Sequence, residues 1–80
     1  MIRKRVPRRD DRIIVDLVKR ELFPYTRRAI PDFQWDPRDI RRRLERNVTF
    51  VAAPRRSETA GFISLKPYGQ VMALDMLAVD

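Results

Sequence analysis

The 80-residue sequence contains no cysteine and no histidine, and it contains only two glycines. Without cysteine there can be no disulfide bond and no thiolate metal site, and the chain is compatible with a reducing compartment. Without histidine the usual metal ligand and the usual general base near neutral pH are both missing. We therefore expect no bound metal.

Long apolar segments are missing as well. The most apolar stretch, residues 71–79, is interrupted by Asp75. It has about half of the roughly 20 residues that a helix needs to cross a bilayer. The first five residues, MIRKR, lack the apolar region of a signal peptide. We expect a soluble, cytoplasmic chain that does not enter a membrane.

Positive charge dominates the composition. Eighteen lysines and arginines face eleven acidic residues, which gives a net charge of +7. A field of this sign attracts polyanions such as nucleic acid, anionic lipid or a phosphorylated cofactor, and it repels polycationic small molecules. Solvated basic faces without any polyanionic partner explain the same composition at least as well.

The N-terminal part predicts a strand followed by a helix. Residues 2–6 alternate apolar and basic side chains, which favours a short edge strand. Asp10 and Asp11 are N-cap candidates for an amphipathic helix, which we expect to end near Phe23 because the next residue is proline. Residues 24–35 are expected to be irregular although they are rich in apolar and aromatic side chains.

A second helix has a clear start signal. Asp36 is the predicted N-cap and Pro37 occupies the first helical position. Trp35 and Ile40 have the spacing of a hydrophobic staple. Asn47 is expected to close this helix as a left-handed C-cap.

The remaining chain predicts three strands joined by short loops, at residues 48–53, 61–66 and 71–79. Residues 54–59 form a predicted hairpin loop, and Pro67 and Gly69 are expected at the second and fourth positions of a tight turn. Loops this short require antiparallel neighbours. The predicted fold class is α+β, with the order strand, helix, helix and a three-stranded antiparallel meander.

Two segments, GFISL at 61–65 and LDMLAVD at 74–80, together with this order of elements, resemble the N-terminal half of the GNAT superfamily of acyl-CoA-dependent N-acyltransferases. In that family a loop reading Q/R-x-x-G-x-G/A follows the last of these strands and binds the cofactor pyrophosphate. The present sequence ends at Asp80, where such a loop would begin. The resemblance therefore implies that residues 1–80 are a single partial domain of an N-acetyltransferase, inactive alone, whose parent transfers an acetyl group from acetyl-CoA to a primary amine.

The resemblance also implies roles for residues of the last strand. The pantetheine arm of acetyl-CoA would hydrogen-bond to the backbone of Leu77, Ala78 and Val79, whose side chains would pack underneath as part of a core. Asp75 would bind or deprotonate the substrate amine, for which a raised pKa would be useful. Alternatively, Asp75 is a solvent-facing or ion-paired aspartate, for instance with Lys66.

Aromatic residues between the two helices correspond to one wall of the acceptor-substrate cleft in the family. Phe23, Tyr25 and Trp35 are the predicted substrate contacts, with Phe33 beside them. The alternative is that these side chains fill a small core, which the staple favours for Phe33 and Trp35. The positive charge argues against spermidine-like acceptors.

Two other functions are compatible with the sequence. A nucleic-acid-binding module is suggested by five arginines of the second helix, namely Arg38, Arg41, Arg42, Arg43 and Arg46, although no helix-turn-helix pattern is present and we do not expect nucleic acid as a partner. The last strand alternatively serves self-association, because an exposed apolar edge is a template for pairing with another copy. We expect the isolated chain to form a homodimer or larger species through residues 71–79.

Overall fold

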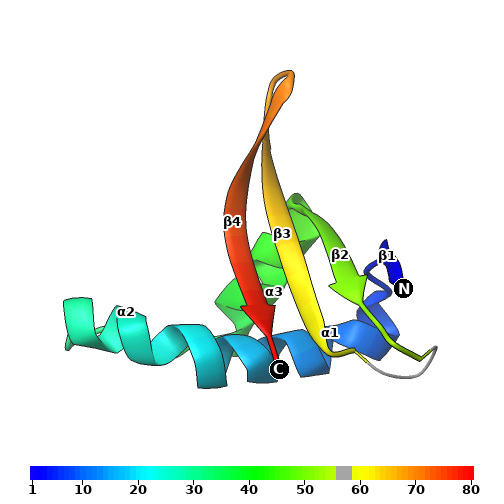
Figure 1. Cartoon of the computed structure of the whole chain (residues 1–80). Helices are drawn as coiled ribbons and strands as arrows, with labels where there is room; N and C mark the ends of the chain where they lie inside the picture. The colour runs from blue at the N-terminus through cyan, green and yellow to red at the C-terminus, as the bar shows by residue number, and fades with distance from the viewer. Residues whose placement is uncertain (56–58) are drawn as a thin grey trace.

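Four antiparallel strands form one sheet in the order β1-β2-β3-β4 (Figure 1). The computed structural model describes residues 1–55 and 59–80. Its elements are β1 (Ile2–Lys4), α1 (Pro7–Leu17), the π-helical segment η1 (Val18–Leu22), α2 (Phe23–Ala29), α3 (Pro37–Arg46), β2 (Val48–Ala52), β3 (Gly61–Tyr68) and β4 (Val71–Val79). The predicted α+β class is confirmed, and the first strand joins the predicted meander to make the sheet four-stranded. No helix in the described part of the chain is long and apolar enough to span a bilayer.

The first helical segment starts earlier and ends later than the sequence predicted. Pro7 is its first residue and Val6 its N-cap, while the Asp10 carboxylate accepts a hydrogen bond from the Val6 N–H at 2.6 Å. The helix continues through Pro24 to Ala29. A proline ring normally collides with the carbonyl four residues before it. Here the chain widens into η1 just before the proline, with the Phe23 N–H bonded to the Val18 carbonyl, and the wider turn relieves that clash.

The second predicted helix is α3, and its start is confirmed. The Asp36 carboxylate accepts a hydrogen bond from the Arg38 N–H at 3.0 Å, and Pro37 is the first helical residue. The prediction of a left-handed C-cap at Asn47 was wrong, because Asn47 is extended with φ −96° and ψ 167°. Its side chain amide instead bonds to the sheet, and the chain runs directly into β2.

The hairpin between β3 and β4 differs from the prediction, because β3 extends to Tyr68 instead of ending at residue 66 and the turn is correspondingly shorter. Tyr68 pairs with Val71, which leaves Gly69 and Gln70 as a two-residue turn, and Pro67 lies within β3 opposite Met72. Gly69 has φ +57°, a conformation that a two-residue hairpin turn with glycine first requires. The predicted loop at 54–59 lies partly outside the described residues, at 56–58.

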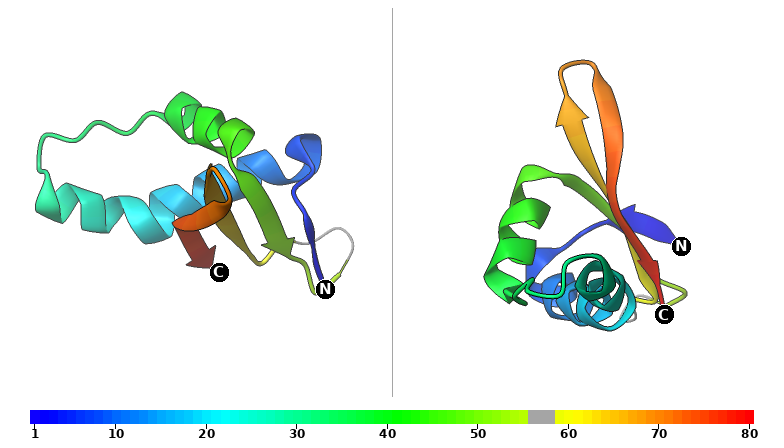
Figure 2. Two further views of the ribbon diagram at one scale, coloured as in Figure 1. Left: turned by 90° about the horizontal axis from the view of Figure 1, so that it is seen from above. Right: turned by 90° about the vertical axis from the view of Figure 1, so that its left-hand side faces the viewer.

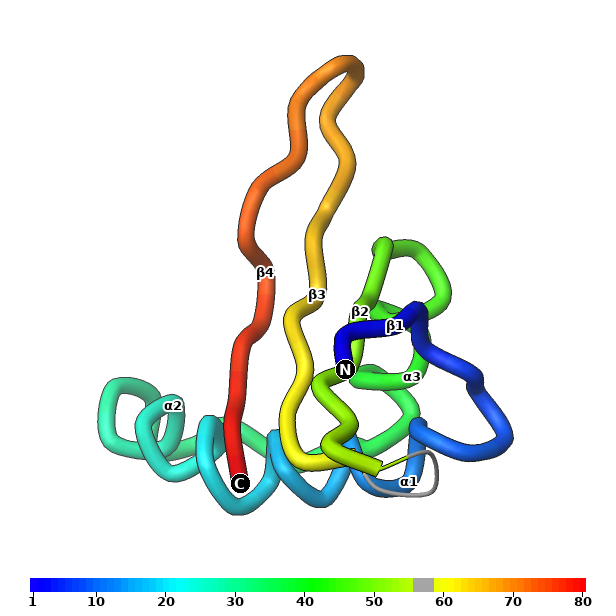
Figure 3. The backbone as a smooth tube through the Cα atoms, turned by 45° about the vertical axis from the view of Figure 1, so that its right-hand side comes forward, coloured from blue at the N-terminus to red at the C-terminus, as the bar shows by residue number. Residues whose placement is uncertain are grey.

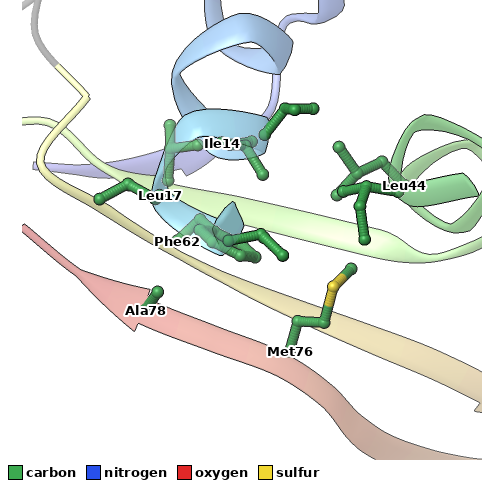
Figure 4. Packing of buried hydrophobic residues seen from close by; sticks show 10 residues of the cluster. Ile14, Leu17, Leu44, Phe62, Met76 and Ala78 are labelled. Atoms are coloured by element: carbon green, nitrogen blue, oxygen red, sulfur yellow. The ribbon is translucent and has the colours of Figure 1, made fainter. Parts of the chain in front are cut away.

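All helices lie on one face of the sheet (Figure 2). The buried apolar side chains of α1, η1 and α3 meet those of β2, β3 and β4 there, as Figure 4 shows for Ile14, Leu44, Phe62 and Met76. The opposite face of the sheet has no helix over it in the described residues. A shallow apolar depression of about 200 Å³ marks this face, between strands β1 to β4.

The distal half of the β3–β4 hairpin projects away from the helices (Figure 3). Residues 66–74 are all exposed, whereas the proximal part of both strands contributes to the core. The body of the molecule therefore ends near the middle of these two strands.

Candidate functional site

A cavity of about 610 Å³ opens between η1, α2, the start of α3 and the middle of β4. Its volume is in the range of small-molecule binding sites. Four of the residues predicted from the sequence as site residues line it: Phe23, Tyr25, Trp35 and Asp75. These residues come from three separate parts of the chain, and the fold brings them to one concave surface.

Asp75 lies on a β-bulge. Ser64 pairs with Met76 and the next residue of β3, Leu65, pairs with Leu74, so Asp75 is the extra residue of β4. A bulge of this kind turns two consecutive side chains toward one face. Met76 accordingly enters the core on the helical side, and Asp75 reaches α3 on that same side. Without the bulge, strand alternation would direct Asp75 to the opposite face of the sheet.

Three hydrogen bonds hold the Asp75 carboxylate. The Arg43 guanidinium donates at 2.7 Å and 3.2 Å, and the Asn47 amide donates at 2.8 Å. Hydrogen bonding by Arg43 lowers the pKa of Asp75 below its ordinary value, against the opposite effect of partial burial. Asp75 is therefore an ionised carboxylate at neutral pH, and the ion-paired alternative is confirmed with Arg43 in place of Lys66.

A chain of polar side chains continues from Asp75 into the sheet. The Asn47 amide also donates to the Ser64 hydroxyl at 3.0 Å, and the Ser64 and Thr49 hydroxyls are 2.9 Å apart. Both hydroxyls are buried. This network fixes the end of α3 to β2 and β3, and with it the orientation of Asp75. The contacts of Arg43 and Asn47 with Asp75 were not predicted, because about thirty positions of sequence separate these residues from Asp75.

The opposite wall of the cavity is aromatic. The Phe23 ring lies 5.2 Å from the Trp35 ring and 6.1 Å from the Phe33 ring between centroids, with tilted planes in both pairs. Trp35 is half-buried and also packs against the core, whereas Tyr25 is exposed at the rim. Trp35 thus serves the core and the cavity wall together, whereas the core position favoured for Phe33 was wrong, because that side chain is 41% exposed.

The outer edge of β4 is open. Among the described residues β4 pairs only with β3, and in an edge strand alternate backbone N–H and C=O groups point away from the sheet. Of the three predicted cofactor-binding residues, Ala78 is buried on the helical side, while Leu77 and Val79 are 50% and 68% exposed on the bare face. The prediction that the side chains of Leu77 and Val79 pack in a core was wrong, because no element of the described chain covers that face.

A second buried carboxylate lies outside the cavity. Asp10 is fully buried and accepts two hydrogen bonds from Arg3, at 2.8 Å and 2.9 Å, and one from Thr59 at 2.7 Å. Burial alone would raise the pKa of Asp10, but hydrogen bonds from Arg3, the Val6 N–H and Thr59 outweigh it and lower the pKa to about 2. With both oxygens satisfied, Asp10 joins β1 and α1 to Thr59, which lies just before β3, and has a structural role.

The arginines of α3 are largely engaged. Arg43 pairs with Asp75, Arg38 with Asp36 at 3.2 Å, and Arg42 with Asp39 at 3.6 Å. A helix that reads nucleic acid needs its cations directed at phosphates, and Arg43 is instead held by Asp75 through two hydrogen bonds, while Arg38 and Arg42 make exposed contacts with aspartates. The geometry of α3 therefore gives no support to a nucleic-acid interface.

No group of three or more acidic side chains in residues 1–55 and 59–80 is placed to hold a metal ion. Comparison of the chain with models of protein families, with curated proteins and with solved structures gives no match.

Proposed function

We propose that this chain supplies the amine-binding side and part of the cofactor edge of an N-acetyltransferase of the GNAT type, which moves an acetyl group from acetyl-CoA to a primary amine. The observation that carries the proposal is the position of Asp75. An ionised carboxylate lies on a bulge of the open edge strand and at the wall of an aromatic cavity. An amine in the cavity and a thioester along β4 would therefore meet at this point.

The element order supports the same proposal. One strand, two helical segments and an antiparallel β2–β3–β4 meander follow one another along the chain. The sheet order places β4 at an edge, which leaves backbone groups for an extended ligand such as the pantetheine arm. Residues 77–79 would offer these groups, and an N–H among them would polarise the thioester carbonyl. The glycine-rich pyrophosphate loop that the resemblance implies is not among residues 1–80, whose two glycines are Gly61 and Gly69.

The proposed reaction requires little from the side chains. The ammonium must first lose a proton to solvent. The amine nitrogen then attacks the thioester carbonyl carbon, and a C–N bond forms while the C–S bond breaks. CoA leaves as a thiolate and takes up the proton that the attacking nitrogen gives up. The lowered pKa of Asp75 favours amine binding over proton abstraction, because a carboxylate with a lowered pKa is a weak base. Asp75 would thus favour amine binding by neutralising the Arg43 guanidinium at the cavity wall, with Arg43 and Asn47 holding the carboxylate in place.

Acetyl transfer can be tested by the release of CoA thiol from acetyl-CoA, using the full product of the gene and a panel of primary amines. We expect thiol release that depends on the amine. Asp75→Asn should raise KM for the amine by roughly tenfold, because it leaves the Arg43 guanidinium as an unpaired cation at the cavity wall. Asp16→Asn is the matched control, because Asp16 is exposed and outside the cavity. Absence of amine-dependent thiol release across the panel would reject the proposal.

A second candidate function is self-association. It is favoured by the open edge of β4 and by the exposed apolar side chains along it: Val71, Met72, Leu74, Leu77 and Val79. Strand pairing between two copies would extend the sheet and cover part of its bare face. The pantetheine arm and a second copy would compete for the same edge.

A further inference from the structure

The geometry points to a specific class of acceptor: a monoamine whose single ammonium binds Asp39 and whose apolar or aromatic body lies against Phe23, Phe33 and Trp35. This inference deepens the proposed function, from which it takes only the expectation that the cavity holds the acceptor. Amine binding itself needs no acetyl-CoA.

The carboxylates of the cavity differ in their free acceptor capacity. Asp36, Asp39 and Asp75 all line it. Asp75 accepts three hydrogen bonds, and Asp36 accepts two, from the N–H and the guanidinium of Arg38. For the Asp39 carboxylate, the closest cation in the described chain is the Arg42 guanidinium at 3.6 Å, which is beyond hydrogen-bond distance. Within the described residues, both Asp39 oxygens are therefore free of hydrogen bonds, whereas Asp36 keeps one free oxygen and Asp75 keeps none, which makes Asp39 the best placed of the three to accept from a ligand ammonium.

The Asp39–Arg42 pair is also easy to open. Both side chains are more than half exposed, at 52% and 60%, so solvent screens their attraction and little is lost when Arg42 turns away. The Asp75–Arg43 pair is less exposed and has two hydrogen bonds, so it stays closed. Asp75 then neutralises Arg43 at the cavity wall, while Asp39 makes the direct contact.

The aromatic wall determines the rest of the ligand. Phe23, Phe33 and Trp35 present tilted rings to the cavity, which favours an apolar body of matching size. A second ammonium would be unfavourable, because Arg27 lies over the Phe23 ring and Arg28 over the Tyr25 ring, each at 5.8 Å from the centroid. Both guanidiniums lie next to aromatic residues that line the cavity, so they would repel a second ammonium that extended past these rings.

Trp35 provides a direct assay on the 80-residue chain, because it is the only tryptophan in the sequence. Its fluorescence is followed during titration with 2-phenylethylamine, and separately with 2-phenylethanol, 3-phenylpropionate and spermidine. We expect saturable binding of the amine, with the neutral alcohol weaker by roughly threefold or more, as for the loss of one partly exposed charge pair. Spermidine and the carboxylate should bind more weakly still.

Asp39→Asn should reduce the affinity for 2-phenylethylamine to that for 2-phenylethanol and leave the alcohol unaffected. Asp32→Asn is the matched control, since it removes the same charge from an exposed position outside the cavity. The inference would be overturned if both variants lost the same affinity for 2-phenylethylamine. It would also be overturned if the wild type bound 2-phenylethanol as tightly as the amine, or bound spermidine or 3-phenylpropionate more tightly. If the amine binds as expected and no acetyl transfer is found, the inference stands and the proposed function fails. If acetyl transfer occurs only with amines that do not bind in this assay, the proposed function stands and the inference about the acceptor fails.

Discussion

Asp10 offers the sharpest test of what holds this small fold together. Its pKa is lowered from 3.8 to about 2, so the native state binds the proton more weakly than the unfolded chain. A shift of this size corresponds to roughly 2 kcal/mol of stability at neutral pH. Because the folded pKa is the lower one, this contribution is fully present above about pH 5 and is lost as the pH falls through 3.8 toward about 2.

Asp10→Asn should lower the free energy of unfolding at pH 7 by about 2 kcal/mol or more. The NH2 group of the new amide is a donor, so it cannot accept the hydrogen bonds that Arg3, Val6 and Thr59 donate to the carboxylate. For a domain of this size the melting temperature should fall by about 10 °C or more.

The assay is urea unfolding followed by circular dichroism at several pH values between 7 and 2. The gap between the wild type and Asp10→Asn should narrow steadily as the pH falls from about 5 to about 2, because the wild type alone loses the Asp10 contribution. Asp16→Asn, an exposed substitution on the same helix, should stay within about 0.5 kcal/mol of the wild type. Parallel pH profiles for the wild type and Asp10→Asn would refute the assigned role of Asp10.

Three further predictions concern the core, a close backbone approach and the open edge. Leu44→Ala should lower the free energy of unfolding by roughly 3 kcal/mol, because Leu44 is fully buried. Leu74→Ala, at an exposed position, should lower it by less than about 0.5 kcal/mol, and equal losses would contradict the described core. Gly61→Ala should destabilise by about 1–2 kcal/mol in thermal melts, because its Cβ would lie 3.0 Å from the Ala78 carbonyl oxygen, and an unchanged melting temperature would count against the β3–β4 register. Light scattering after size exclusion should show dimers or larger species whose share rises with concentration. Leu77→Lys should abolish them, because a charge on the exposed edge strand opposes strand pairing, and a monomer at every concentration would exclude self-association.

The parts of the fold that the sequence predicted are those set by local chemistry. Asp36 and Pro37 mark the start of α3 because a cap and a first-turn proline act within a few residues. The strands were predicted from their apolar patterns, and the structure places β4 at a sheet edge as one continuous strand. The proline rule that predicted a helix end near Phe23 failed, because the π turn removes the clash at Pro24 and the helix continues to Ala29.

The parts that the sequence did not predict depend on contacts between distant segments. Asn47 adopts an extended backbone because its amide bonds Ser64 and Asp75, and these bonds replace the left-handed cap. The bulge at Asp75 appears only when β3 and β4 are in register. The aromatic residues could be assigned to one region from their positions in the sequence. The cavity, however, depends on α2, which continues the helix past Pro24 and places Phe23 and Tyr25 in the same lining as the start of α3.

The projecting tip of the β3–β4 hairpin has a practical consequence. Gln70 lies in its two-residue turn, far from the buried side chains, and the chain contains no cysteine. Gln70→Cys would therefore introduce a unique thiol to which a spin label or dye can be attached without disturbing the interior. Each molecule would then carry one label, and the distance between the labels of two associated molecules would show whether their hairpins align tip to base or tip to tip.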